Sequence, residues 1–239
     1  MMKRMGRFLF LLFLFMPMVA QANTVTEGKD GLTWTFSSVM RMTSEGARYD
    51  IRWENDYGQG MITRDEEIDV EPFGQLDENG LPWVIWSRQK QDGHYRLHLS
   101  TFNGYVWSDP EELPVFEEFV NDRECNFRLG DTGRVYITFL RELLGEHRVM
   151  FGIYKTWSGG WTEVGPVTTL EEGYTARQPN VFMIYDDLDV LAEILISFIH
   201  VYPEGEGMVP PDGDGLYETI AQYLRVFNSG DTSPWFSVQ

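Results

Sequence analysis

Apolar and polar residues alternate over short runs along most of this chain, and helical periodicity is weak nearly everywhere. Val135 to Phe139 is one such run, built from β-branched and aromatic residues. Runs of this length, bounded by Gly, Asn, Asp and Pro, are typical of short β-strands joined by tight turns. The pattern therefore predicts an all-β fold.

The runs recur with a period of 53 to 54 residues. Phe73, Phe127 and Val181 stand 54 residues apart, and each precedes a polar turn, two further β-prone runs and a small turn that leads to a Trp. A unit of about 50 residues with four short strands has the size of a propeller blade. We expect a β-propeller-like array of about four four-stranded antiparallel blades, with a β-sandwich as the alternative.

Three full units are expected at residues 67–120, 121–174 and 175–239, and residues 23–66 hold a partial unit. Within the partial unit, Thr33 to Phe36 and Tyr49 to Trp53 are plausible strands. An array that does not close exposes strand edges, which can pair with a second copy or with another chain.

The first 22 residues have the features of a secretory signal peptide. A basic start precedes an apolar run at Phe8 to Ala20, and Ala20-Gln21-Ala22 is an A-x-A cleavage signal. The run is shorter than the roughly 20 residues that span a bilayer. We therefore expect a mature chain that starts at Asn23, lies in the periplasm or outside the cell, and has no membrane association after cleavage.

The charge balance excludes two classes of partner. With 19 Lys and Arg against 37 Asp and Glu, the formal net charge is −18. Nucleic-acid binding depends on cations that neutralise phosphates, and docking on anionic lipid needs the same charge. The single cysteine, Cys125, has no disulfide partner in the chain, and a buried structural thiol is the expected role.

Three segments combine a small polar turn with a Trp: Thr101 to Trp107, Thr156 to Trp161 and Ser229 to Trp235. They resemble degenerate copies of the Asp-box, S/T-x-D-x-G-x-x-W, of sialidase-like (BNR-repeat) β-propellers. The resemblance covers about residues 64–239. It implies that polar side chains pin a hairpin and that the Trp packs between sheets, and it implies nothing catalytic.

Two arginines stand 54 residues apart, Arg123 and Arg177, at the expected entrances of inner strands. In sialidases an arginine cluster at such entrances holds the substrate carboxylate, so the resemblance implies ligand contact there. At this spacing Asp69 occupies the corresponding position of the preceding unit, and the family's Phe-Arg-Ile-Pro signature is absent. The alternative is that the arginines balance the neighbouring Glu71 and Glu124.

The loops between second and third strands supply further candidates. His94 and His147 stand 53 residues apart in two such loops, and they are expected to be exposed residues with a candidate role in ligand binding. The corresponding loop of the last unit is about 20 residues longer. It places Asp212, Asp214 and Glu218 at spacings that suit a calcium ion, with a solvated acidic turn as the alternative.

The sequence favours an exported, non-catalytic binding module for a glycan or protein ligand, with calcium as the one candidate cofactor. A sialidase-like glycoside hydrolase is the first alternative, although no catalytic residue can be assigned. An assembly component that pairs through open β-edges, as a homo-oligomer or with another chain, is the second.

Overall fold

The computed structural model describes residues 22–27, 31–114, 117–130, 133–143, 146–156, 158–167, 175–185, 191–201 and 218–226. Within these ranges the chain forms 15 β-strands and no α-helix, which confirms the all-β prediction. The described part therefore contains no helix with the length and apolarity needed to span a bilayer.

The strands form four successive antiparallel units, called blades below. The first blade contains β1 (Ala22–Glu27), β2 (Thr33–Thr43), β3 (Gly46–Asn55) and β4 (Gly58–Met61). The second contains β5 (Ile68–Leu76), β6 (Pro82–Gln89), β7 (Tyr95–Thr101) and β8 (Glu111–Glu112). The third contains β9 (Asn121–Leu129), β10 (Arg134–Leu143), β11 (Glu146–Lys155) and β12 (Gly160–Pro166). The fourth contains β13 (Thr175–Tyr185), β14 (Leu191–Val201) and β15 (Glu218–Val226). The first blade thus has four strands where the sequence indicated two.

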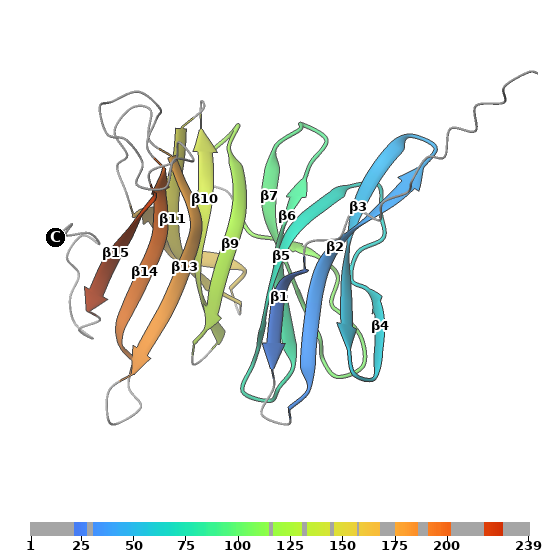
Figure 1. Ribbon diagram of the computed structural model, residues 1–239, viewed down its shortest axis with the longest axis horizontal. Helices are drawn as coiled ribbons and strands as arrows, with labels where there is room; N and C mark the ends of the chain where they lie inside the picture. The colour runs from blue at the N-terminus through green and yellow to red at the C-terminus, as the bar shows by residue number, and fades with distance from the viewer. Residues whose placement is uncertain are drawn as a thin grey trace, which may run out of the picture.

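The blades stand side by side in an open row, which fits a propeller-like array (Figure 1). One parallel pairing, Tyr49 with Ile68, joins the first and second blades into a continuous eight-stranded sheet. The first strands β1, β5, β9 and β13 all run downward in Figure 1. Their starting ends, together with the connections between second and third strands, form one end of the molecule, called the entrance face below.

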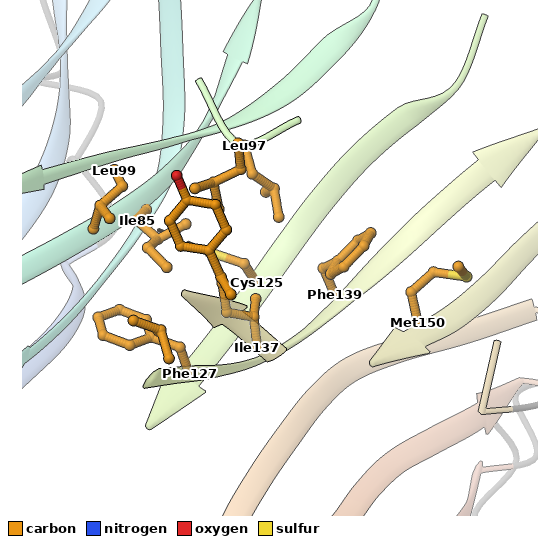
Figure 2. Packing of buried hydrophobic residues seen from close by; sticks show 11 residues of the cluster. Ile85, Leu97, Leu99, Cys125, Phe127, Ile137, Phe139 and Met150 are labelled. Atoms are coloured by element: carbon orange, nitrogen blue, oxygen red, sulfur yellow. Dashed lines mark hydrogen bonds between the residues drawn. The ribbon is translucent and has the colours of Figure 1, made fainter. Parts of the chain in front are cut away.

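Three apolar clusters fill the spaces between neighbouring blades. In β10, Ile137 and Phe139 pack toward the second blade, while Tyr136 and Leu140 pack toward the fourth. Figure 2 shows the first of these clusters, where Ile85 and other residues of the second blade face the third. Alternating side chains that are buried on both faces explain why the inner blades have strands with near-continuous apolar character.

A β-bulge occurs at the same place in three first strands. The register shifts between Val70 and Phe73 in β5, between Arg123 and Asn126 in β9, and between Arg177 and Asn180 in β13. The bulged residues Glu71, Glu124 and Gln178 have φ values of 56°, 48° and 50°, in the left-handed region that non-glycine residues seldom adopt. Their spacing is 53 and then 54 residues.

This alignment corrects the position assigned to Asp69. The residue of β5 that corresponds to Arg123 is Val70, and Asp69 corresponds to Asp122. Matching Phe73 to Phe127 misplaced the register by one residue, because Gly74 is the true counterpart of Phe127. A Cβ atom on Gly74 would lie 2.3 Å from the ring of Phe36, which occupies that space from the first blade.

The hairpin after β7 is fixed by Asn103. Its Oδ1 accepts hydrogen bonds from the N–H groups of Tyr105 and Val106, both at 2.9 Å. Trp107 then packs between the first two blades, with its ring centroid 6.1 Å from that of Phe36 and perpendicular to it. Trp235 lies outside the described residues, so its role remains a prediction.

Candidate functional site

The three bulges are joined across the blades by hydrogen bonds, called the bulge ladder below. Oε2 of Glu71 accepts the backbone N–H of Glu124 at 3.0 Å, and Oε2 of Glu124 accepts the N–H of Gln178 at 2.9 Å. Each bulged side chain thus binds the bulged backbone of the next blade. The ladder places three polar residues from separate strands side by side on the entrance face.

Arg123 is held at this ladder by two contacts. Its guanidinium donates two hydrogen bonds to Glu71, one of them from Nε to Oε2 at 3.3 Å, and its Cζ lies 4.8 Å from the ring centroid of Tyr95. Burial opposes the charge of Arg123, but the hydrogen bonds and charge of Glu71 outweigh it, so the pKa of the guanidinium is raised. The side chain remains 43% exposed, so a ligand can reach it.

Arg177 occupies the corresponding position in β13, one residue before the bulge, and is exposed. Among the described residues it has no carboxylate partner. The two predicted arginines therefore share a position in the fold, but only Arg123 is fixed by an ion pair with a described residue.

The two predicted histidines differ in what can be described. His94 lies in the β6–β7 connection, is half-buried, and meets the ring of Phe119 edge-on at 5.8 Å. His147 lies in β11 with its backbone opposite Glu142. Nothing in these contacts brings either histidine to Arg123.

The candidate calcium site falls mostly outside the described residues, where Asp212 and Asp214 lie. Glu218 is the first residue of β15, with its backbone opposite Val201. In the ranges that the structure describes, no group of three or more His, Cys, Asp or Glu side chains is arranged to hold a metal ion.

Two buried ion pairs support the entrance face, and the sequence analysis missed both. Asp69 accepts hydrogen bonds from Nε and Nη2 of Arg88 at 2.7 and 2.8 Å, and Asp122 accepts the same pair from Arg141 at 2.8 and 2.8 Å. Both aspartates and both arginines are 53 residues apart, a repeat that was visible in the sequence. In the fourth blade Ala176 stands where Asp122 does, so this blade lacks the pair.

These pairs are structural because their carboxylates are inaccessible. Asp69 is 0% exposed and Asp122 is 3% exposed. Burial raises the pKa of Asp122, although the hydrogen bonds and charge of Arg141 act in the opposite direction. Bidentate pairing of this kind fixes the ends of β5 with β6 and of β9 with β10, and so fixes the strands that carry the bulge ladder.

Cys125 does not contribute chemistry to the face. It is 5% exposed, packs in the cluster between the second and third blades, and its Sγ lies 3.6 Å from the carbonyl oxygen of Ile85. Burial raises the pKa of its thiol, with a smaller contribution from Glu71. A thiol that stays protonated is a poor nucleophile.

Comparisons with known proteins show a shared fold. No family model and no curated protein matches the chain. Among solved structures, it is similar to a thermostable family-43 glycoside hydrolase, with 11% identity, a TM-score of 0.56, and coverage of 90% of this chain and 75% of that chain. It is similar to an N-acetylgalactosamine deacetylase from F. plautii, solved with blood group B trisaccharide, with 6% identity, a TM-score of 0.58, and coverage of 85% and 71%. An endo-1,4-beta-xylanase from Bacteroides thetaiotaomicron matches with 11% identity, a TM-score of 0.51, and coverage of 88% and 72%. At these identities the likeness shows that the chain shares a β-fold with proteins that act on glycans.

Proposed function

We propose that this protein is an exported glycan-binding protein whose ligand lies on the entrance face at Arg123. The observation that carries the proposal is the accessible guanidinium of Arg123, fixed by Glu71 and stacked over the ring of Tyr95. Glycan sites combine apolar ring surface with a few fixed polar groups, and this arrangement supplies both. The shared fold with glycan-acting proteins supports the same conclusion.

Binding fits this geometry better than hydrolysis does. Both oxygens of Glu71 already accept hydrogen bonds from the protein, from Arg123 and from the N–H of Glu124. One oxygen of Glu124 is likewise occupied by the N–H of Gln178. Carboxylates engaged in this way organise a surface instead of exchanging protons with a substrate.

A glycan array followed by titration calorimetry tests the proposal. Arg123→Ala should weaken binding of the best array ligand by about tenfold or more, because it removes a fixed donor from the contact surface. Arg52→Ala is the matched control, since Arg52 pairs with Glu54 in the first blade and is also partly exposed, at 35%. Equal affinity in the wild type and Arg123→Ala would refute this location for the ligand.

A sialidase-like glycoside hydrolase is the second candidate. It is favoured by the presence of two glutamates, Glu71 and Glu124, on neighbouring bulges of one accessible face. A reducing-sugar assay on a glycan panel detects such an activity. Turnover that survives both Glu71→Gln and Glu124→Gln would exclude these residues, and absence of turnover on every glycan that binds would exclude the enzyme.

Export is a separate part of the proposal. The basic, apolar and A-x-A segments at the start of the chain support it. N-terminal sequencing of the protein recovered from outside the cytoplasm should give Asn23 as the first residue. Recovery of an intact Met1 from the cytoplasmic fraction alone would contradict it.

A further inference from the structure

Most arginines of the described chain are paired with carboxylates. Seven of them take part in ion pairs: Arg41, Arg48, Arg52, Arg88, Arg96, Arg123 and Arg141. Arg128 of β9 is half-buried, yet it has no ion pair with any described carboxylate. In a chain with 37 acidic residues, an enclosed cation without a counter-charge requires an explanation.

Arg128 is instead held between aromatic rings from two other blades. Its Cζ lies 6.0 Å from the ring centroid of Phe73 in β5 and 5.8 Å from that of Phe182 in β13. Its Nη1 donates to the Oδ1 of Asn126 at 3.3 Å and to the carbonyl oxygen of Phe127 at 2.9 Å. Three first strands therefore position one guanidinium.

Part of this guanidinium is available to a ligand. Nε and Nη2 of Arg128 have no acceptor among the described residues, and Phe182 beside it is 41% exposed. Burial without a compensating carboxylate lowers the pKa of Arg128, whereas the pKa values of Arg41, Arg88 and Arg123 are raised by their acidic partners. The site therefore holds a positive charge that an anion would stabilise.

The position is separate from Arg123. Arg128 follows the bulged Glu124 by four residues, which corresponds to about 13 Å along an extended strand, away from the entrance face. The charges of the distant acidic surface are screened beyond about 8 Å at physiological ionic strength, so they do not prevent an anion from binding here.

We propose that Arg128 anchors a second subsite that binds the carboxylate of an acidic sugar. The planar guanidinium presents donors in the geometry of a carboxylate, and the rings of Phe73 and Phe182 offer apolar surface to the sugar. The choice of a sugar as the carrier of the carboxylate rests on the proposed glycan-binding function.

The test compares galacturonic acid with its methyl ester, which differ in charge but share the sugar ring. Calorimetry and thermal melts are run on the wild type, Arg128→Met and Arg134→Met, an exposed arginine of β10 that serves as the control. The wild type and Arg134→Met should bind the acid about tenfold more tightly than the ester, and Arg128→Met should lose this preference. An acid preference that survives Arg128→Met, or its absence in the wild type, would overturn the subsite.

Two further arms keep the outcomes separate. If Arg128→Met does not fold, Arg128→Lys retains the charge but not the planar fork, and its acid preference should fall severalfold; an unchanged preference would argue against carboxylate recognition. Sodium acetate that stabilises the wild type as much as galacturonate would overturn the assignment of a sugar. Arg123→Ala should weaken neutral glycans and keep the acid preference. An acid preference that depends on Arg128 in a protein that binds no array glycan would reject only the entrance-face function.

Discussion

Acidification from pH 7 to pH 4 should destabilise this protein through the buried imidazole of His98. This residue lies in β7, is 3% exposed, and has its ring 6.0 Å from that of Trp86. Its Nδ1 lies 3.3 Å from the carbonyl oxygen of Arg96, and its Nε2 lies 3.7 Å from Glu112. Burial, with the charges of Arg88 and Lys90, lowers its pKa to about 4, although the Arg96 carbonyl and Glu112 oppose the shift.

The size and sign of the effect follow from this pKa. In the unfolded chain His98 has an ordinary pKa of about 6.5, so between pH 6.5 and pH 4 the unfolded state binds a proton that the folded state does not. Stability from the neutral imidazole is complete above pH 6.5 and is lost as the pH falls toward 4. The difference of about 2.5 pH units corresponds to about 3 kcal/mol of unfolding free energy.

Urea unfolding at pH 7 and pH 4 measures this loss, and His98→Gln and His98→Leu remove the titration. Both variants should lose about 3 kcal/mol less than the wild type over this interval, whatever their stability at pH 7. Other groups that titrate, such as Asp122, are present in all three proteins and cancel in the comparison. If the wild type and both variants lose the same free energy between the two pH values, the reasoning about His98 is wrong.

Two further substitutions test the buried polar groups. Asp122→Ala leaves Arg141 buried without its main partner and should cost about 3 to 5 kcal/mol in urea unfolding; a loss below 1 kcal/mol would show that the pair is not tightly enclosed. Trp86→Phe removes the Nε1 donor that Asp69 accepts at 2.7 Å, whereas the Nε1 of Trp34 has no acceptor among the described residues. Trp86→Phe should therefore destabilise the protein by about 1 to 2 kcal/mol more than Trp34→Phe, and equal melting curves would contradict this.

The strand pattern was predictable because its signals are local. Short alternating runs and the turns between them identify β6 and β10 without knowledge of their partners. The strand β4 was missed because Gly58 to Met61 is short and glycine-rich and has no apolar alternation. Its pairing with β3 comes from the fold of the first blade, which a single segment does not reveal.

The support of the entrance face was harder to predict. Asp69 and Asp122 read as exposed residues within strands, and only their arginine partners across the sheet permit their burial. The bulges were hidden because Glu71 and Glu124 adopt left-handed conformations where a sequence-based analysis expects glycine. One extra residue in each first strand shifted the repeat from 54 to 53, and so misplaced Asp69.

The bulge ladder has a consequence for how the repeats can diverge. In each rung one partner is a side chain and the other is a backbone N–H, which every residue except proline supplies. Mutation of the receiving residue therefore leaves the rung intact, as Gln178 illustrates by accepting the same link as Glu124. Only half of each junction is under selection for residue identity, so neighbouring blades can drift apart in sequence while their spacing and alignment persist.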